Sequence, residues 1–473
     1  MNLTDLLEKF SDFLSSIDSF LWGYPLIFLI VFSGIFLTIR LRFIQIFHFG
    51  RSLKLILEKD PNSKGDISTF GALCTSLSST IGTGNIIGVA LAVSAGGPGA
   101  LFWMVTVAFF GMAVKYAEGY LAVKYRHVSN SGKFLGGPFC YIEKGLGTKA
   151  KPLAVFFAAM CLCASVFGLG TFIQINGIIS AANSFFDPHS LHTVSRTNIT
   201  ATTLFFSITV TIFAAYCILG GIKRISAVSK ILIPSVSLLY VGSCLFLIIL
   251  NISRLPEAII LIIKSAFYPK AILGAGLGIT FKDVITKGIS RGVFSNEAGL
   301  GTAPIAAASA KASHAVNQGL VLMTGVFFDT IIICSMTGLS IVLTNSCNYA
   351  EKNLDGAYIT AKAFSKGLYL SEQTALFIVM LCLIVFAFTT IIGWNIYGER
   401  CLDYLFGEKP YLTVIYRLIY IASIFVGSFL STEIIWTIAN IFNALMAFPN
   451  LIALFFLSPI IATETRIFLK NFK

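Results

Sequence analysis

The feature that most constrains this chain is a stretch of 48 residues, 67 to 114, that contains no charged side chain. A membrane crossing needs about 20 apolar residues, so this stretch is long enough for two. Within the first crossing, where a membrane helix should be most apolar, the sequence is Ser78-Ser79-Thr80-Ile81-Gly82-Thr83-Gly84-Asn85. Unpaired backbone groups are very unfavourable in hydrocarbon unless protein or ligand satisfies them. The pattern therefore predicts a broken transmembrane helix, and the break is a candidate binding site.

The rest of the chain has the composition of a polytopic membrane protein. Hydrophobic residues make up 56% of the 473 positions and charged residues 12%, with a mean hydropathy of +0.84. We therefore expect an all-α polytopic membrane protein with about eleven spans in one continuous domain. The predicted spans are residues 21–40, 69–93, 99–123, 153–180, 201–219, 231–250, 284–310, 317–344, 371–396, 411–428 and 433–460.

The distribution of positive charge predicts the orientation of these spans. With the N-terminus outside, 21 of the 34 lysines and arginines fall in inward-facing segments, nine in outward-facing segments and four within spans. This bias predicts an N-terminus outside and a C-terminus in the cytoplasm, in the plasma or inner membrane. The net charge of +12 is explained by these short basic loops and by anionic lipid headgroups, so we expect no nucleic-acid partner.

The order of the spans predicts an internal symmetry. Without the first span, ten remain, and two sets of five must start from opposite faces of the membrane, as in an inverted repeat. The first span of each set, 69–93 and 284–310, carries a glycine-rich interruption, the second at 295–304. The chain is therefore expected to have three segments. Residues 1–66 form an N-terminal amphipathic segment, the first membrane helix and a basic inner loop. Residues 67–460 form the transporter core, with repeats at about 67–252 and 270–460, and residues 461–473 form a cytoplasmic tail.

Several motifs follow one another between about residues 70 and 460. They are Gly82-Thr83-Gly84-Asn85-Ile86-Ile87-Gly88-Val89-Ala90, Gly96-Gly97-Pro98-Gly99-Ala100, Lys115-Tyr116-Ala117-Glu118, Gly136-Gly137-Pro138, Arg291-Gly292-Val293-Phe294-Ser295-Asn296-Glu297-Ala298-Gly299-Leu300-Gly301, Ile391-Ile392-Gly393-Trp394, Tyr397-Gly398-Glu399-Arg400, Asn443-Ala444-Leu445-Met446-Ala447 and Pro449-Asn450. In this order they resemble the alanine or glycine:cation symporter family, the sodium:alanine symporters. The resemblance implies a leucine-transporter-type fold, with one N-terminal helix plus a 5+5 inverted repeat with two broken helices. It also implies cotransport of a small neutral amino acid with sodium.

The first break has the chemistry to receive an amino acid. The second half of a split helix starts with free N–H groups and a partial positive charge, so the amides of Thr83 and Gly84 can receive a carboxylate. Asn85 offers an amide to substrate or ion, and Asn296 lies in the second break. Gln174 can line the substrate cavity or form a hydrogen bond between helices. Trp394 can form a wall of the pocket or serve as an anchor at the membrane interface.

A sodium site is implied by the resemblance to the leucine-transporter fold. The carbonyl groups of Ser78 and Ile81 would face the hydroxyls of Thr389 and Thr390, and the carbonyl of Phe386 would complete the shell. Thr389 and Thr390 are adjacent polar residues in an otherwise apolar run. The alternative is that each hydroxyl bonds a carbonyl of its own helix.

Charged residues within spans are expected to be paired, because an isolated charge there is very unfavourable. We expect Lys115 to pair with Glu118, three residues later, and Arg291 with Glu297, in structural or gating ion pairs on the inner side. Asp329 is a lone acid in an apolar span. It can bind a cation or proton, or bond a neighbouring broken helix, and we favour the second.

These observations predict a secondary active transporter that imports alanine, with glycine or serine as further substrates, together with sodium. The sequence contains no HExxH or phosphate-binding motif, and we expect neither catalysis nor a cofactor, with sodium as the co-substrate. The partners are then the amino acid, sodium and the bilayer, and we expect a monomer. The open alternatives are another small solute, protons as the driving ion, and a passive channel.

Overall fold

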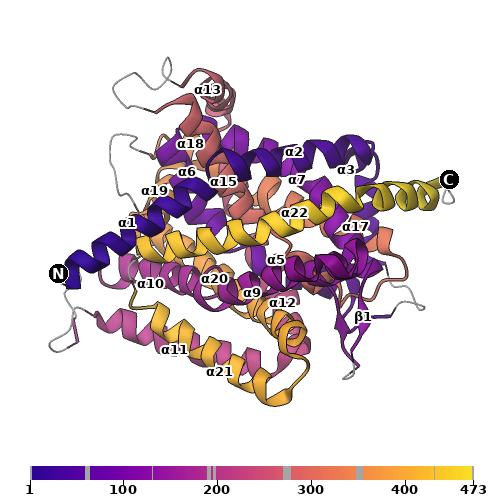
Figure 1. Ribbon diagram of the computed structural model, residues 1–473. Helices are drawn as coiled ribbons and strands as arrows, with labels where there is room; N and C mark the ends of the chain where they lie inside the picture. The colour runs from indigo at the N-terminus through magenta and orange to yellow at the C-terminus, as the bar shows by residue number, and fades with distance from the viewer. Residues whose placement is uncertain are drawn as a thin grey trace.

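The computed structural model describes residues 3–58, 64–129, 132–188, 193–194, 199–269, 279–347, 355–430 and 432–470. Its helices lie side by side between two ends of the molecule, with α1 reaching one end and the C-terminal end of α22 the other (Figure 1). Five cations that enter the charge count, Lys59, Arg196, Lys270, Lys352 and Lys473, lie outside the described residues.

The segment before the first break forms helices that flank the core. α1 packs against α2 and α22, and α2 packs against α7. The bounds are α1 (Leu3–Leu21), α2 (Tyr24–Arg40), α3 (Ile44–Phe47) and α4 (Phe49–Leu57).

The first repeat contains five membrane-crossing units and a short hairpin. The first unit is the predicted broken helix, α5 followed by η1 and α6, bent by 55°. The bounds are α5 (Thr69–Thr80), η1 (Gly84–Gly88), α6 (Val89–Gly96), α7 (Gly99–Lys124), β1 (His127–Val128), β2 (Phe134–Leu135), α8 (Pro138–Leu146), η2 (Thr148–Ala150), α9 (Lys151–Phe167), α10 (Phe172–Phe186), α11 (Ala201–Leu219), α12 (Gly221–Leu250), η3 (Ile252–Arg254) and α13 (Leu255–Phe267).

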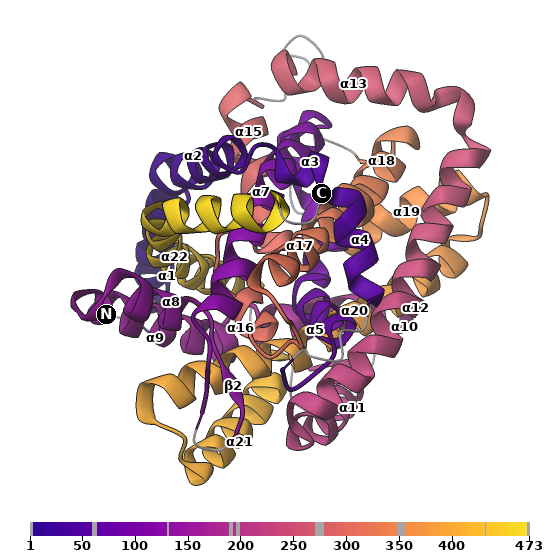
Figure 2. The ribbon, with the colours of Figure 1, turned by 90° about the vertical axis from the view of Figure 1, so that its right-hand side faces the viewer.

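The second repeat has the same order of units. Figure 2 shows α13 lying along the edge of the bundle, between the end of α12 and the start of α15. The bounds are α15 (Phe281–Asn296), α16 (Ala303–Ala307), α17 (Ala315–Val326), η5 (Phe327–Cys334), α18 (Ser335–Leu343), α19 (Gly356–Leu368), α20 (Glu372–Phe406), α21 (Pro410–Gly427) and α22 (Thr432–Lys470).

Length and composition identify nine helical segments able to cross a membrane among the described residues, and ten when the bent pair is one span. The remaining predicted span, 284–310, the seventh in chain order, consists of α15 and the five-residue α16, which pack against α7 and α5. α15 has only 16 residues and contains Lys282, Lys287 and Arg291, so it is too short and too charged to be counted with the others. The predicted 5+5 order with two broken helices is confirmed.

Local sequence explains where several of these helices begin. Ser68, Thr200 and Ser371 each accept a hydrogen bond from the backbone N–H three residues later, at 3.1, 3.1 and 3.2 Å. These hydroxyls satisfy a donor that a helix otherwise leaves free at its N-terminus. They fix the starts of α5, α11 and α20.

One expectation differs from the structure. The predicted span 153–180 is interrupted at 168–171, between α9 and α10, where Gly168 has φ −134° and ψ −123° and cannot continue the helix. The apolar pattern indicates this span, but it does not indicate where the backbone turns. At the other end of the chain, α22 continues into the predicted tail 461–473 as far as Lys470.

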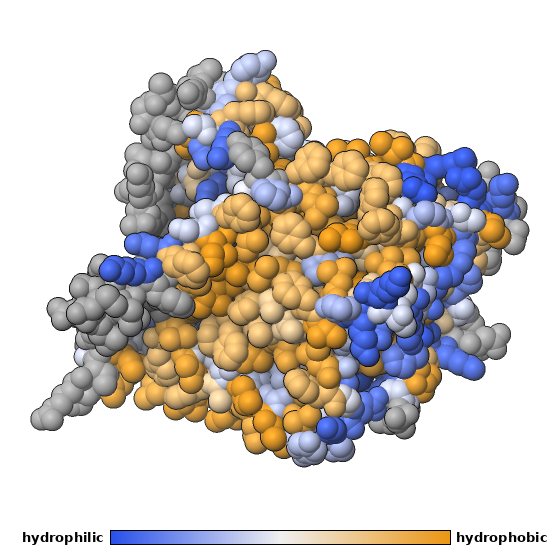
Figure 3. All heavy atoms as spheres, viewed as in Figure 1, coloured by the Kyte–Doolittle hydropathy of each residue, from blue (hydrophilic) through white to orange (hydrophobic). Residues whose placement is uncertain are grey.

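The surface agrees with a membrane location. Figure 3 shows an apolar belt across the middle of the molecule, with hydrophilic residues gathered at the end where α22 terminates. Large apolar side chains are exposed along α11, α12 and α21, among them Phe213, Leu238 and Leu418. Such a surface is expected of helices that face lipid. The chain is an integral membrane protein.

Candidate functional site

All eleven residues that the sequence predicts for substrate and sodium are buried in the structure. They come from α5, the break that follows it, η1, α10, α15 and α20. These residues are Ser78, Ile81, Thr83, Gly84, Asn85, Gln174, Asn296, Phe386, Thr389, Thr390 and Trp394.

At the first break, side chains replace the missing backbone partners. The Gly82 N–H donates to Asn85 Oδ1 at 2.9 Å, and the Thr83 N–H donates to Gln174 Oε1 at 3.1 Å. On the other side of the break, Trp394 Nε1 donates to the Ser79 carbonyl at 3.2 Å. Buried backbone groups require such partners. The Thr83 N–H was expected to bind a substrate carboxylate, and in this conformation it donates to the Gln174 side chain.

The glycines of this break allow close contacts that a side chain would prevent. A Cβ atom on Gly82 would lie 2.6 Å from Thr390 Oγ1 and 2.8 Å from Gln174 Oε1. A Cβ atom on Gly84 would lie 3.3 Å from the Phe294 ring and 3.3 Å from Ser295 Cα. Gly84 therefore lets the first broken helix approach the second.

Three of the predicted sodium ligands converge. Thr390 Oγ1 lies 3.0 Å from the Ile81 carbonyl oxygen and 3.1 Å from the Phe386 carbonyl oxygen. The Thr390 hydroxyl has one proton, so it can donate to only one of these two carbonyl oxygens at a time. Thr389 Oγ1 bonds the Phe386 carbonyl of its own helix at 2.8 Å, and Ser78 Oγ likewise bonds the Thr75 carbonyl at 2.8 Å. The arrangement is rich in oxygen, as a hard cation requires.

The second break is held by a buried carboxylate from α7. Glu118 Oε1 accepts from the N–H groups of Gly299 and Gly301, both at 3.2 Å, and from Asn450 Nδ2 at 2.7 Å. Gly299 and Gly301 have φ values of +91° and +79°, which favour glycine. Lys115 Nζ lies 3.9 Å from Glu118 Oε2, so the predicted pair is confirmed. Glu118 thus pairs two backbone N–H groups of the second break that the interrupted helix leaves free.

Asp329 joins the two breaks. Its Oδ1 accepts from Asn85 Nδ2 of the first break at 2.7 Å, and its Oδ2 accepts from Ser295 Oγ at 2.9 Å and Thr330 Oγ1 at 2.7 Å. Asn296 Nδ2 in turn donates to Thr330 Oγ1 at 3.0 Å. The favoured interpretation, a bond to a broken helix, is confirmed for both helices.

The predicted pair of Arg291 and Glu297 is wrong. Glu297 accepts from Trp394 Nε1 at 3.0 Å and from Thr302 Oγ1, while the Arg291 guanidinium lies 4.5 Å from the centre of the Trp436 ring. Glu297 follows the end of α15 and adopts φ +54°, so its side chain leaves the helical face of Arg291. The expectation that every charge within a span is paired with an opposite charge therefore gave Arg291 the wrong partner.

The end of the molecule that carries the hairpin is closed. Lys311 N–H donates to the Ile67 carbonyl at 2.8 Å, which joins the start of the first broken helix to the end of the second. Arg126 donates to the carbonyl groups of Ala308 and Ala310 at 2.8 and 2.7 Å. These contacts hold the two broken helices together at this end of the molecule.

Ion pairs strengthen the same closure. Arg400 Nη2 lies 3.6 Å from Asp66 Oδ2, and Arg400 Nη1 lies 3.6 Å from Asp403 Oδ2. Asp66 precedes α5 and Arg400 lies near the end of α20, so the pair joins a broken helix to an unbroken one.

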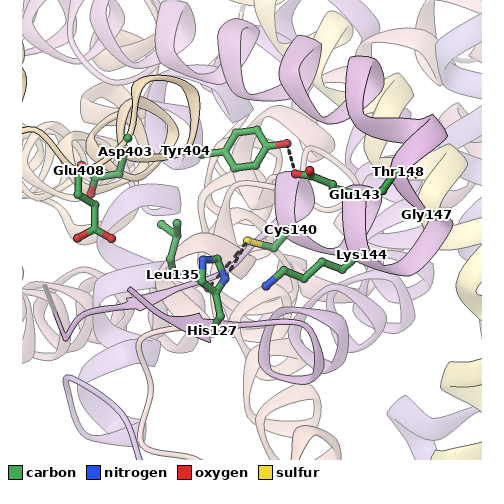
Figure 4. A pocket seen from close by; sticks show the side chains of 11 residues that line it. His127, Leu135, Cys140, Glu143, Lys144, Gly147, Thr148, Asp403, Tyr404 and Glu408 are labelled. Carbon is green, nitrogen blue, oxygen red and sulfur yellow. Dashed lines mark hydrogen bonds between the residues drawn. The ribbon is translucent and has the colours of Figure 1, made fainter. Parts of the chain in front are cut away.

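A cavity of about 880 Å³ at the hairpin end contains none of the break residues. Figure 4 shows Tyr404 Oη donating to Glu143, at 2.6 Å, and His127 Nδ1 beside Cys140 Sγ, at 4.0 Å. Among the described residues, no group of three His, Cys, Asp or Glu side chains could hold a metal ion. The candidate site is thus the pair of breaks.

Comparison with known proteins agrees with this geometry. The model of the sodium:alanine symporter family matches residues 7–473. This chain belongs to that family. It is 49% identical over 460 residues to an uncharacterized transporter of Haemophilus influenzae, covering 97% of this chain and 96% of the relative. It is 42% identical over 464 residues to the sodium/alanine symporter AgcS of Methanococcus maripaludis, covering 97% of each chain.

A solved structure of another protein shares the fold of this chain. The transporter MhsT, crystallised in complex with L-phenylalanine, superposes with a TM-score of 0.53 and 15% identity. The match covers 85% of this chain and 99% of MhsT. The leucine-transporter-type fold is therefore shown, and the family is one of cation-coupled amino-acid transporters.

Sequence reasoning missed several residues of this symporter-family site. It did not connect Glu118 or Asn450 with the second break, although both are polar residues within predicted spans. Asn450 also donates from Nδ2 to the Gly299 carbonyl at 2.9 Å. Their polarity within apolar runs was the available signal.

Proposed function

We propose that the protein is a secondary active transporter that imports alanine, with glycine or serine as further substrates, coupled to inward sodium flow. The observation that carries the proposal is the meeting of two broken helices whose free backbone groups are bonded by buried side chains. Such breaks allow backbone and side chains to bind a zwitterion and a cation within the membrane. The name of the AgcS relative supports alanine and sodium as the transported pair.

The substrate would lie against the first break. We propose that its carboxylate displaces Gln174 Oε1 from the Thr83 N–H and also receives the Gly84 N–H. Asn85 and Asn296 would orient it, and Trp394 would limit the size of the side chain. The burial of all six residues supports a small substrate.

Sodium would bind where the first helix breaks. We propose the carbonyl oxygens of Ser78, Ile81 and Phe386 and the hydroxyls of Thr389 and Thr390 as its ligands. The short distances from Thr390 Oγ1 to two carbonyl oxygens support this set, because rotating the hydroxyl proton away would leave three oxygens directed at one cation.

Transport would proceed by alternating access. The closed hairpin end would be the cytoplasmic side, with the N-terminus outside and the C-terminus in the cytoplasm, as the basic loops favour. Opening would require release of the Arg400 and Arg126 contacts. The 5+5 order supports movement of one set of helices against the other.

Protons are the alternative driving ion. Glu118, Glu297 and Asp329 are buried acids near the breaks, and any of them could carry a proton. A passive channel is less well supported, because the polar residues meet at the breaks and one end is closed.

Uptake of radiolabelled alanine into proteoliposomes tests the proposal. We expect concentration of alanine with an inward sodium gradient and none when potassium or protons replace sodium. Concentration driven by protons alone would instead select the alternative, and equilibration without an ion requirement would contradict active transport.

A further inference from the structure

A second pocket, of about 620 Å³, lies at the end opposite the hairpin. α1, α2, α15 and α22 contribute to its wall, and it contains both acidic and basic side chains. Phe294 lines it, and the same ring would lie 3.3 Å from a Cβ atom added at Gly84 in the first break. The pocket and the first break therefore share one aromatic side chain.

Arg291 presents a fixed positive charge to this pocket. Its guanidinium lies 4.5 Å from the centre of the Trp436 ring and 5.9 Å from that of Phe294. Stacking on an aromatic face orients the planar fork while leaving its N–H donors available. A carboxylate is the group that such a fork binds best.

Asp18 presents a negative charge from α1. Trp22 Nε1 donates to the Asn440 carbonyl at 2.9 Å, and Asn440 Nδ2 donates to Asp18 Oδ2 at 3.5 Å. Asp18 Oδ1 is buried without a hydrogen-bond partner. The side chain is thus positioned, but one of its oxygens still requires a donor.

Asp18 and Arg291 interact electrostatically, yet the ion pairs within 4.0 Å among the described residues do not include one between these two. The other charged residues of the wall are Lys282, Asp283 and Lys287. The Asp283 carboxylate accepts from the Thr280 N–H and hydroxyl at 3.0 and 2.6 Å, and so serves to cap α15. Asp18 keeps a buried oxygen without a donor and Arg291 is oriented on an aromatic ring, so these two opposite charges are the pair best placed for a ligand.

We infer that this pocket is an entry site for zwitterionic amino acids, in which Arg291 binds the carboxylate and Asp18 the ammonium group. The inference rests on the proposed function and adds a site outside the breaks. The pocket would select molecules that carry both charges before Phe294 admits them to the first break. α1, which lies outside the ten-helix repeat, would thereby contribute to recognition.

Protection of an introduced cysteine tests the entry site. Ser290 lines the pocket, so Ser290→Cys places a thiol there with little change in size. Modification by a membrane-impermeant thiol reagent would be measured on the full-length protein in sodium-free buffer, where the proposed sodium-coupled site is not engaged. We expect alanine at about four times its dissociation constant to slow modification about fivefold, because occupancy sets the free fraction. Propionate and ethylamine, which each lack one charge, should protect far less.

Two variants identify the residues responsible. Arg291→Gln and Asp18→Asn, each combined with Ser290→Cys, should abolish protection, while Lys287→Gln, which removes another cation of the same wall, should retain it. If Arg291→Gln does not fold, Asp18→Asn on the peripheral α1 decides the question. Absence of protection by alanine, or protection that survives Asp18→Asn, would overturn the entry site. Such a result would overturn the entry site alone, because sodium-driven uptake of alanine tests the proposed function separately.

Discussion

Individual hydroxyl and carboxyl groups determine how the breaks are held. Thr390 bonds a carbonyl of another helix, whereas the neighbouring Thr389 bonds its own helix. Glu118 satisfies two N–H groups of the second break at once. Loss of the Thr390 hydroxyl should therefore affect sodium binding, and loss of the Glu118 carboxylate should affect stability.

Thr389→Ala and Thr390→Ala should both weaken sodium dependence more than they weaken alanine affinity at saturating sodium. We expect the larger effect for Thr390→Ala, about a tenfold rise in the sodium concentration for half-maximal uptake, which corresponds to one well-formed ligand. Sodium titrations of uptake measure it. Ser235→Ala removes an exposed hydroxyl that bonds its own helix and serves as the control. Equal loss of sodium and alanine affinity would count against the proposed ligand set.

Glu118→Ala should destabilise the protein by about 3–5 kcal/mol, because it leaves Lys115 and the N–H donors of Gly299 and Gly301 buried and unpaired. Thermal unfolding in nanodiscs measures the change. Glu257→Ala removes an exposed carboxylate and should have almost no effect. Unfolding of Glu118→Ala at the wild-type temperature would show that the bonds to the second break contribute little.

The residues at the breaks could be predicted because polar side chains and glycines stand out within apolar spans. Their partners could not, since Glu118 and Asn450 are 332 positions apart and meet only through the crossing of α7 and α22. The contact of Arg291 with Trp436 also joins residues that are distant in the sequence, and so Arg291 was assigned to the nearby Glu297. The αL conformation of Glu297 changes the direction of that side chain, and spacing does not indicate it.

At the scale of elements, the interrupted helices are the functional units. α5, η1 and α6 were predicted from the glycine pattern, and so was the break after α15. The interruption between α9 and α10 and the π-helix η5 were not predicted, because their apolar composition continues through the irregular backbone. η5 places Asp329 between the two breaks.

Gly84→Val should abolish uptake without preventing membrane insertion. The added side chain would press against the Phe294 ring and Ser295 Cα, and so separate the two broken helices. Uptake and the amount of folded protein in the membrane are measured together. Gly88→Ala is the matched control, since a Cβ atom there meets nothing within 4 Å. Normal uptake by Gly84→Val would show that close approach at Gly84 is unnecessary.

At the scale of the whole molecule, closure at one end defines the conformation. The ion pairs of Arg400 and the backbone bonds between 64–67 and 309–312 hold the two repeats together. Ten of the predicted spans follow from hydropathy, whereas the span 284–310 and the inverted repeat were predicted from the order of the spans and the second glycine-rich interruption. The closed state could not be predicted, because it depends on contacts between segments that are distant in sequence.

Arg400→Ala should favour the conformation open at the hairpin end and lower concentrative uptake. Removing the guanidinium leaves Asp66 without this partner and weakens the contact between α20 and the start of α5. Reactivity of a cysteine introduced at Asn395, which lines the adjoining pocket, measures the opening. Lys223→Ala removes an exposed cation of the same pocket and should leave reactivity unchanged. Unchanged reactivity in Arg400→Ala would exclude a gating role for this ion pair.

Simultaneous measurement of labelled sodium and labelled alanine entering the same proteoliposomes tests whether the two solutes are coupled at the breaks. Coupled binding predicts that alanine stimulates sodium entry in a fixed ratio and that alanine accumulates above its external concentration until the sodium gradient is spent. Alanine entry that proceeds at the same rate without sodium, or sodium entry that does not respond to alanine, would contradict a coupled site at the two breaks.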